Sequence, residues 1–377
     1  MISSTAKFII GCKIQPKVVR IGADTGNVLT PACKNGIKST EVMVLKLDPI
    51  FSSNMVFAAG LPIRIYGTGQ GKGKVIFAGK SKSFVSEKDT WILEFSPMDF
   101  GGPYELKTVF DDTEVLFKDI YIGKVLLCAG QSNMQFKIGE AHVPEQLLRS
   151  NQKLRMFATH RLEKERFSTK DGWIKADKEN IGDWSAIGYL VGNGISEKED
   201  IAVGIICCYQ GASMIESWVP QGIFKAEGIA VPDDKKHHDF HIEPYSFWNR
   251  DGFLYDYAFS QVVPFSVSAV IWYQGESNTS TEGGKAYRRM MERLIQVWRG
   301  DFGNDRLPFV IVQIADYTPS LNEGWRLVQK AQLDVQNTTA KVKTVISADV
   351  CEKDDIHPPT KHLLAQRIIC ALSDLIE

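Results

Sequence analysis

Apolar runs separated by polar and glycine-rich segments divide the chain into two textures, with the change near residues 105–120. Before that point, short apolar runs such as 42–45, 63–66 and 74–77 alternate with turn-forming residues, which is typical of an antiparallel β-sandwich or jelly roll. The glycine-rich stretch 67–73 is interpreted as a solvated hairpin turn, because neither a helix nor a Lys-Ser/Thr pair follows it as a phosphate-binding loop requires.

After Lys118, apolar runs alternate with long amphipathic segments. Continuous apolar runs predict buried strands, and apolar positions spaced three and four residues apart predict helices. The predicted strands are 125–129, 201–207, 267–272, 309–314 and 343–346, and the predicted helices are 185–196, 287–298, 322–334 and 361–372. This alternation predicts an α/β fold in which a parallel sheet carries helices on both faces, preceded by a smaller antiparallel β-sandwich domain. We expect domains at 1–110 and 111–377, with an insertion around 219–250.

One predicted strand ends at Gly130, and a serine follows two residues later. A strand, a tight turn and a serine in this order lift the hydroxyl clear of the sheet and bring backbone N–H groups toward a reacting carbonyl. The alternative is a strand followed by an ordinary polar turn. Ser132 is therefore a candidate nucleophile whose assignment depends on the rest of the chain.

A candidate partner for this serine lies about twenty residues from the C-terminus. His357 can take the proton of Ser132 as a general base. Asp354, three residues earlier, can hold the imidazole in the required tautomer. We expect a Ser–His–Asp triad, and a Ser132–His357 dyad without Asp354 is the alternative.

Four blocks in this chain order resemble the sialate O-acetylesterase family of the SGNH hydrolase superfamily. They are GQSNM (130–134), GASMIESW (211–218), IWYQGESN (271–278) and DIHP (355–358) with Lys361. Residues 51–57 and 101–106 resemble the N-terminal β domain of that family, so the resemblance runs from about Asp48 to the C-terminus. It implies a carbohydrate esterase that removes O-acetyl groups from sugars, most directly from sialic acid, through an acetyl-serine intermediate and without a cofactor.

Attack on an ester places negative charge on the carbonyl oxygen, and preorganised donors at that point contribute about 3 kcal/mol. The N–H groups of Ser132 and Gly211 are candidate donors, since each follows a predicted strand. The resemblance implies a third donor from the side-chain amide of Gln274, with Asn278 as the alternative. The family commonly has two adjacent glycines where this chain has Gly211 and Ala212, so the Ala212 N–H is a further alternative.

Three residues are candidate substrate-binding groups: Gln131, Asn278 and Arg326. The guanidinium of Arg326 either pairs with a sugar carboxylate or forms a surface salt bridge. Nearby Tyr317 and Trp325 either stack on a sugar ring or belong to the core.

The histidines His237, His238 and His241 fall within five residues, after a polar stretch that reads as a solvated loop. Metal ligation needs several converging donors, so we expect no metal site. A rim of the substrate cleft is the alternative to a solvated loop for this segment. Glu276 is interpreted as a buried carboxylate that fixes its own loop rather than as an acid or base.

Composition agrees with a globular enzyme, because 44% of the 377 residues are apolar and 24% are charged. A net charge of −1 gives no basis for binding nucleic acid or an anionic membrane surface. Residues 8–10 form an apolar patch too short for a signal peptide, and the seven cysteines show no Cys-x-x-Cys spacing. We expect reduced thiols, with Cys128 and Cys207 buried, and a cytoplasmic location.

The expected partner is an acetylated mono- or oligosaccharide substrate. Two other functions remain open: an acetylxylan or other polysaccharide acetylesterase, and a non-catalytic carbohydrate-binding protein. The presence of Ser132, Asp354 and His357 together disfavours the second of these, since a binding protein has no use for all three.

Overall fold

The computed structural model describes residues 44–160, 162, 167–229 and 247–376. The candidate cleft rim at His237, His238 and His241 and much of the insertion around 219–250 lie outside these residues. Contacts within Val42–Glu377 make this span one compact unit.

Most strands before residue 111 pair with their neighbours in antiparallel fashion. One sheet contains β1 (Lys46–Leu47), β3 (Ile63–Thr68) and β6 (Thr90–Phe95), and the strands β4 (Gly71–Phe77), β5 (Lys80–Ser86) and β7 (Gly101–Phe110) pair with one another beside it. Aromatic side chains fill the space between the sheets: the rings of Phe77 and Phe95 lie 6.3 Å apart and those of Trp91 and Phe110 5.4 Å apart. The predicted antiparallel N-terminal region is confirmed.

The prediction of a hairpin turn at 67–73 is wrong. The strands on either side of this stretch, β3 and β4, pair with different partners and belong to different sheets. Two of the glycines serve close packing instead: a Cβ at Gly67 would lie 1.9 Å from the Lys46 carbonyl oxygen, and one at Gly73 would lie 2.4 Å from the Phe84 ring.

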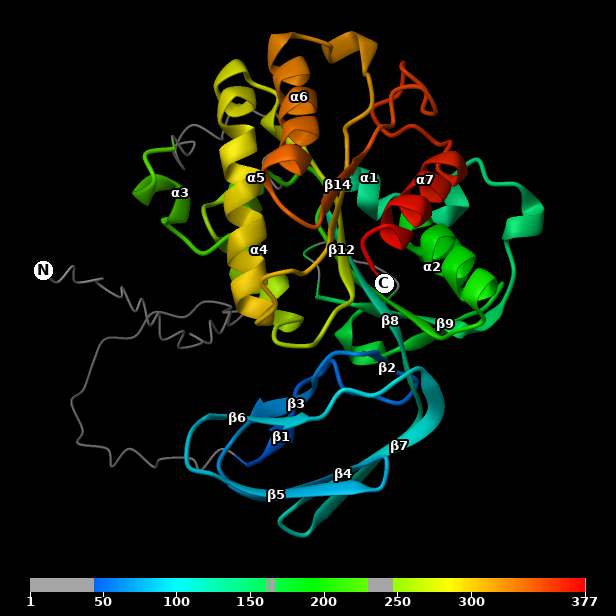
Figure 1. Ribbon diagram of the computed structural model, residues 1–377, viewed down its shortest axis with the longest axis vertical. Coiled ribbons are helices and arrows are strands. Elements are labelled where there is room, and N and C mark those ends of the chain that lie inside the picture. The colour runs from blue at the N-terminus through cyan, green and yellow to red at the C-terminus, as the bar shows by residue number, and fades with distance from the viewer. Residues whose placement is uncertain (1–43, 161, 163–166, 230–246, 377) are drawn as a thin grey trace, which may run out of the picture. The chain divides into compact units, whose positions relative to one another are not determined.

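The long strand β8 (Thr113–Gly130) belongs to two regions of sheet (Figure 1). Its first half pairs with β7 in antiparallel fashion, and the short strand β2 (Val56–Ala58) pairs with its middle. Its second half pairs in parallel with β11 (Val203–Tyr209) on one side and β12 (Ala269–Tyr273) on the other. The last residues of β8 are therefore held between two buried neighbours.

The remaining strands extend this mixed sheet to the order β10-β9-β11-β8-β12-β13-β14. They are β9 (Asn151–Ala158), β10 (Ile174–Ala176), β13 (Phe309–Val312) and β14 (Val342–Val345). Only β10 is antiparallel to its neighbour in this part of the sheet. All five strands predicted after Lys118 are present, and β9 and β10 were not predicted because polar residues interrupt their apolar pattern.

Helices cover both faces of the parallel strands, as predicted (Figure 1). Alternate residues of β8 belong to two separate cores: Leu127 packs in the core that includes α5 (Thr281–Phe302) and α6 (Glu323–Thr338), and Leu126 packs in the core of α2 (Ala186–Glu199) and α7 (His362–Ser373). Polar caps start three of these helices, because the side chains of Ser185, Ser280 and Asn322 accept backbone N–H bonds from the first turn.

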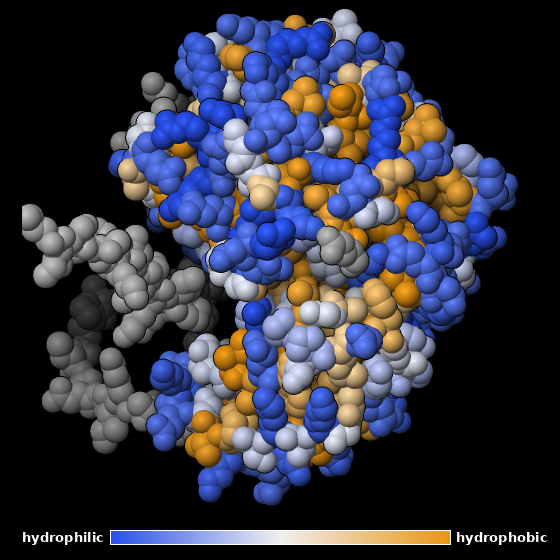
Figure 2. Space-filling view, viewed as in Figure 1, coloured by the Kyte–Doolittle hydropathy of each residue, from blue (hydrophilic) through white to orange (hydrophobic). Residues whose placement is uncertain are grey.

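Three shorter helices, α1 (Ser132–Gln135), α3 (Ile223–Ala226) and α4 (Phe253–Tyr257), lie in the connections. Cys128 and Cys207 are buried in the sheet as predicted. On the face seen in Figure 2, hydrophobic residues are interspersed among many hydrophilic ones, as is ordinary for a water-exposed surface. Among the described residues, no helix combines the length and apolar character that crossing a bilayer requires.

Candidate active site

Three neighbouring parallel strands deliver polar residues to one edge of the sheet. Gly130 at the end of β8 lies opposite Tyr209 on β11 and Tyr273 on β12. Ser132, Gly211 and Gln274 follow these strands within two residues. The carboxyl ends of parallel strands share an edge, which is where ligands bind in open α/β sheets.

The turn that carries Ser132 depends on a glycine at position 130. Gly130 has a φ of +134°, and a Cβ there would lie 2.1 Å from the Tyr273 carbonyl oxygen. The following N–H, that of Gln131, donates to this oxygen at 2.9 Å, and the Gln210 N–H donates to the Gly130 oxygen at 3.1 Å. The turn is therefore fixed to both adjacent strands, and it presents a half-buried Ser132 as the first residue of α1.

Gly211 lies beside this serine. A Cβ at Gly211 would be 3.9 Å from the Ser132 Cβ and 3.1 Å from the Gln135 side-chain oxygen. Within the described residues, neither the Ser132 nor the Gly211 N–H donates a hydrogen bond. Ala212 has a left-handed φ of +53°, so it adopts at this position a conformation that a glycine tolerates better.

The histidine loop contacts the residues that follow Ser132. Asn133 Nδ2 donates to the Ile356 carbonyl oxygen at 2.9 Å, and the rings of Phe136 and His357 stack with centres 6.3 Å apart and planes 29° apart. Both Ser132 and His357 are partly accessible. The contacts between the two segments run through Asn133 and Phe136, and no hydrogen bond joins the Ser132 hydroxyl to the imidazole in the described part of the chain.

Among the described residues, three charged side chains act on the imidazole of His357. Burial and the positive charge of Lys361 lower the pKa of His357 below its ordinary value of 6.5, while Asp355 and Glu140 act in the opposite direction. Asp355 also accepts the His357 backbone N–H at 2.8 Å. Asp354 is exposed and forms no hydrogen bond or ion pair with any described residue, so its role as orienting carboxylate stays a prediction.

The amide of Gln274 is fully buried and engaged. Its Nε2 donates to the Ser213 carbonyl oxygen at 2.9 Å and to Asn278 Oδ1 at 2.8 Å, and its Oε1 accepts from the Tyr287 hydroxyl at 2.7 Å. An amide nitrogen carries two hydrogens, so Gln274 has to exchange a partner before it can bind an oxyanion. Asn278 is equally committed, to the Ile215 N–H and to Glu216.

Gln131 connects the turn that carries Ser132 to the block at 271–278. Its side-chain oxygen accepts the N–H groups of Gly275 at 3.2 Å and of Ser277 at 3.4 Å. The same block contributes Glu276, which is buried and accepts from Asn133 Nδ2 at 2.6 Å. Burial raises the pKa of Glu276, and hydrogen bonds to its carboxylate oppose that rise.

Arg326 stands at the start of α6 and pairs with Asp316 at 2.9 Å, with its side chain 56% exposed. Lys353 pairs with the same carboxylate at 3.6 Å, so two cations share one anion there. Trp325 is buried and donates its indole N–H to the Ala315 oxygen, which makes it a core residue, and the Tyr317 ring lies 6.0 Å from it.

Asn133 and Lys361 belong to the four sequence blocks, but no role was predicted for either residue. A signal was present for the lysine: Lys361, Leu364, Ala365 and Ile368 share one helical face, and the last three are apolar. All four are buried in the structure, so a cation at an apolar periodic position marks an unusual site.

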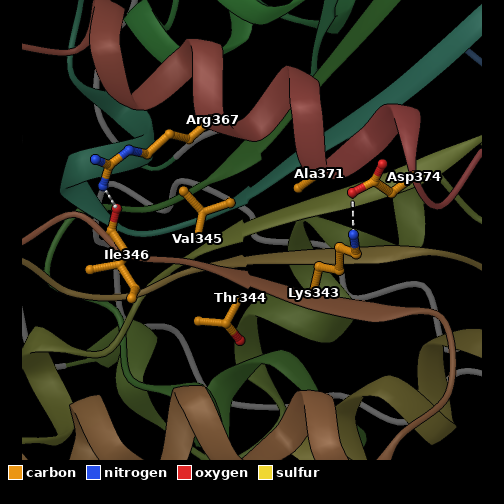
Figure 3. Close-up of a pocket in the computed structure, with 7 residues that line it drawn as sticks. All are labelled: Lys343, Thr344, Val345, Ile346, Arg367, Ala371 and Asp374. Atoms are coloured by element: carbon orange, nitrogen blue, oxygen red, sulfur yellow. Dashed lines mark hydrogen bonds and ion pairs between the residues drawn. The ribbon is translucent and has the colours of Figure 1, made fainter.

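A surface hollow of about 320 Å³ lies elsewhere, between β14 and α7 (Figure 3). Arg367 and Asp374, which line it, are held by the Ile346 carbonyl oxygen and by Lys343 respectively. None of the predicted site residues lines this hollow. No group of three or more His, Cys, Asp or Glu side chains suited to a metal ion occurs in the described ranges.

Comparison with known proteins gives a consistent picture. Residues 122–368 match the family described as carbohydrate esterase, sialic acid-specific acetylesterase. The human sialate O-acetylesterase is 24% identical over 361 residues, covering 86% of this chain and 68% of that protein, and the mouse protein is 24% identical over 382 residues, covering 86% and 70%. The crystal structure of a carbohydrate acetylesterase from Xanthomonas citri superimposes with a TM-score of 0.76 at 24% identity, over 88% of this chain and 75% of that one.

The fold, with its large mixed sheet, flanking helices and N-terminal antiparallel sheet, is that of the SGNH-type carbohydrate esterases. The family match begins within β8 and ends within α7, so it includes the turns that carry Ser132, Gly211 and Gln274 and the loop of His357. This chain belongs to the sialic acid-specific acetylesterase family of carbohydrate esterases, which are hydrolases of acetyl esters.

Proposed function

We propose that this chain is a serine esterase that removes an O-acetyl group from acetylated sialic acid. The observation that carries the proposal is the meeting of Ser132, Gly211 and the His357 loop at one edge of the sheet. Membership of the family supports deacetylation of a sugar, and the names of the human and mouse relatives favour sialic acid as that sugar.

In the proposed mechanism the Ser132 oxygen attacks the acetyl carbonyl carbon while His357 Nε2 or Nδ1 removes the hydroxyl proton. The carbon–oxygen π electrons move to the carbonyl oxygen, which becomes the oxyanion. Collapse of this intermediate breaks the bond to the sugar oxygen, and that oxygen takes the proton from the imidazolium. A water molecule then attacks the acetyl-Ser132 ester with His357 again as base, which releases acetate and restores the serine.

The backbone N–H groups of Ser132 and Gly211 are proposed to hold the oxyanion. Gly211 lies beside Ser132, and neither N–H donates a hydrogen bond within the described residues. Such preorganised donors are typically worth about 3 kcal/mol each in the transition state. Gln274 is kept as a third donor, on condition that its Nε2 releases Ser213 or Asn278.

The orienting carboxylate is proposed to be Asp354, as the chain order Asp–x–x–His suggests. The neighbouring Asp355 is the rival, since its charge acts on the imidazole and its side chain accepts the His357 N–H. Substitution of each by asparagine separates the two, as set out in the Discussion.

Sialic acid carries a carboxylate that neutral acetylated sugars lack, and Arg326 is proposed to bind it. Arg326 and Lys353 together carry two positive charges against the single charge of Asp316. An arriving carboxylate can therefore pair with the exposed guanidinium while Lys353 keeps Asp316 neutralised.

The test compares hydrolysis of 9-O-acetyl sialic acid, acetylated xylo-oligosaccharide and p-nitrophenyl acetate by the whole chain and by Ser132→Ala. We expect the highest kcat/KM on the sialic acid ester and loss of all three activities in Ser132→Ala. A faster reaction on the xylo-oligosaccharide indicates a polysaccharide acetylesterase. Unchanged hydrolysis in Ser132→Ala refutes the serine mechanism, and an inactive wild-type chain that still binds the sugar indicates a carbohydrate-binding protein.

A further inference from the structure

A buried lysine links three of the four sequence blocks at the base of the candidate site. Lys361 is fully buried, and its Nζ donates to Asn133 Oδ1 at 2.7 Å. The amide nitrogen of Asn133 in turn donates to Glu276 Oε1 at 2.6 Å and to the Ile356 oxygen at 2.9 Å. One asparagine, next to Ser132, thus joins the third block and both sides of the histidine loop.

The same ammonium group contacts two aromatic rings. The Nζ of Lys361 lies 5.1 Å from the centre of the Phe136 ring and 5.4 Å from that of Tyr273. Phe136 is also the ring that stacks on His357. The cation is therefore within one side chain of the imidazole, and because Lys361 itself is fully buried, solvent screens its charge weakly.

Holding a cation at this place is costly. A buried ammonium loses several kcal/mol of hydration, and a well-packed apolar side chain of similar volume is often no less stable in such a position. Among the described residues, the Lys361 ammonium has one hydrogen-bond acceptor, Asn133, and Glu276 Oε2 has no hydrogen-bond partner. Stability alone does not explain this arrangement, whereas a role in the reaction does.

We propose that Lys361 is a positioning residue of the esterase, which holds the His357 loop against the Ser132 turn through Asn133 and maintains a fixed positive charge beside the imidazole. This inference rests on the proposed function, because it assigns the role of general base to His357.

Electrostatics supports the second half of the inference. The charged groups that act on His357 are Lys361, Asp355 and Glu140. Those that act on Lys361 are Cys351, Glu276, Glu352 and Asp355, and burial lowers the pKa of Lys361 from 10.5 to about 8, so it is mostly charged at neutral pH.

Removal of the lysine charge leaves Asp355 and Glu140 as the charges acting on the imidazole, and both raise its pKa. A general base works in its neutral form. The pKa of His357 sets the acid limb of the pH profile of kcat/KM, so loss of Lys361 has to move that limb to higher pH.

The experiment measures kcat/KM for p-nitrophenyl acetate across the pH range in the full chain and in three variants. Lys361→Met removes the charge and the hydrogen bond, and Asn133→Ala removes the tether but keeps the charge. Lys330→Met is the control, because Lys330 is an exposed lysine of α6 that pairs with Asp334 and is not among the charges that act on His357.

We expect Lys361→Met to lower kcat/KM on the pH plateau by about 100-fold, the cost of a misplacement of about 1 Å, and to move the acid limb upward by at least about half a pH unit. Asn133→Ala should lower the plateau while leaving the limb in place. Lys330→Met should change neither. If Lys361 only supported the local structure, Lys361→Met would lower the plateau of kcat/KM and leave the pH of the acid limb unchanged.

A folded Lys361→Met enzyme with an unshifted limb overturns the inference. If that variant is unfolded at the assay temperature by circular dichroism, Lys361→Gln, which keeps a donor toward Asn133 without the charge, takes its place and is judged by the same limb. The proposed function fails separately, since it predicts that Ser132→Ala is inactive whatever the lysine does.

Discussion

Replacement of Gly130 by alanine is the sharpest single test of the geometry that presents Ser132. The added Cβ would lie 2.1 Å from the Tyr273 carbonyl oxygen and 2.6 Å from its carbonyl carbon, whereas real Cβ contacts below 3.0 Å essentially never occur. The difference of 3.0 − 2.1 = 0.9 Å has to be absorbed by backbone, because the obstructing atoms belong to a central strand.

The cost has two parts. A φ of +134° is strained for alanine and costs about 1–3 kcal/mol. Moving the turn also weakens the bonds of the Gln131 N–H to Tyr273 and of the Gln210 N–H to Gly130, each worth about 1 kcal/mol. The sum is about 3–5 kcal/mol, a large share of the roughly 5–15 kcal/mol that stabilises an ordinary domain.

The measurement is urea unfolding of the wild-type chain and of Gly130→Ala, followed by esterase kinetics on whatever folded variant remains. A shift of the turn by about 1 Å should also reduce kcat by about 100-fold. Gly300→Ala is the matched control, because Gly300 lies in α5 with no atom within 4 Å of the added Cβ, and it should stabilise the chain by about 0.5–1 kcal/mol. If the free energy of unfolding of Gly130→Ala lies within about 0.5 kcal/mol of the wild-type value and the variant keeps its kcat, the close approach of β8 and β12 at Gly130 is refuted.

Three further outcomes are expected. Asp354→Asn should stay folded and react far more slowly if Asp354 orients His357. Full activity of that variant would instead indicate a Ser132–His357 dyad or Asp355 as the orienting carboxylate. Asp355→Asn should move the acid limb of kcat/KM to lower pH, because the charge of Asp355 raises the pKa of His357. Arg326→Gln should raise KM for O-acetyl sialic acid about tenfold and leave KM for p-nitrophenyl acetate unchanged, and an equal rise for both would remove Arg326 from carboxylate binding. Burial raises the pKa of Asp48 to about 6 from 3.8. The contribution of this carboxyl to the stability of the folded state is therefore fully present below about pH 4 and is lost as the pH rises through 6. Asp48→Asn should raise the free energy of unfolding in urea at pH 8 by up to about 3 kcal/mol and leave it unchanged at pH 3.

Much of the fold could be predicted because its strands are uninterrupted apolar runs. Val125, Leu126 and Leu127 are all fully buried, which is what a strand covered on both faces requires. Strand β9 escaped prediction because Arg155 lies within it; that side chain is buried and stacks on Tyr121 at 4.2 Å, a compensation that no local pattern reveals.

The sequence could indicate which segments contribute to the candidate site, but not which hydrogen bonds their side chains form. Ser132, Gly211 and His357 follow strands or lie near the C-terminus in a recognisable order, so their meeting at one edge could be expected. The commitment of both Gln274 N–H groups to Ser213 and Asn278 could not, because it depends on how three separate loops pack. Lys361 was overlooked since a charged residue at the start of a helix ordinarily faces solvent.

The eighteen-residue strand β8 has a consequence for how this protein melts. It gives the antiparallel sheet and the sheet edge near Ser132 one continuous backbone, so loss of pairing at the β7 end and disorder at Gly130 occur in the same strand. Heat should therefore abolish esterase activity and expose the buried Trp91 of the N-terminal sheet in a single cooperative transition, and a chain started at residue 111 would leave the first half of its central strand without the pairing of β7.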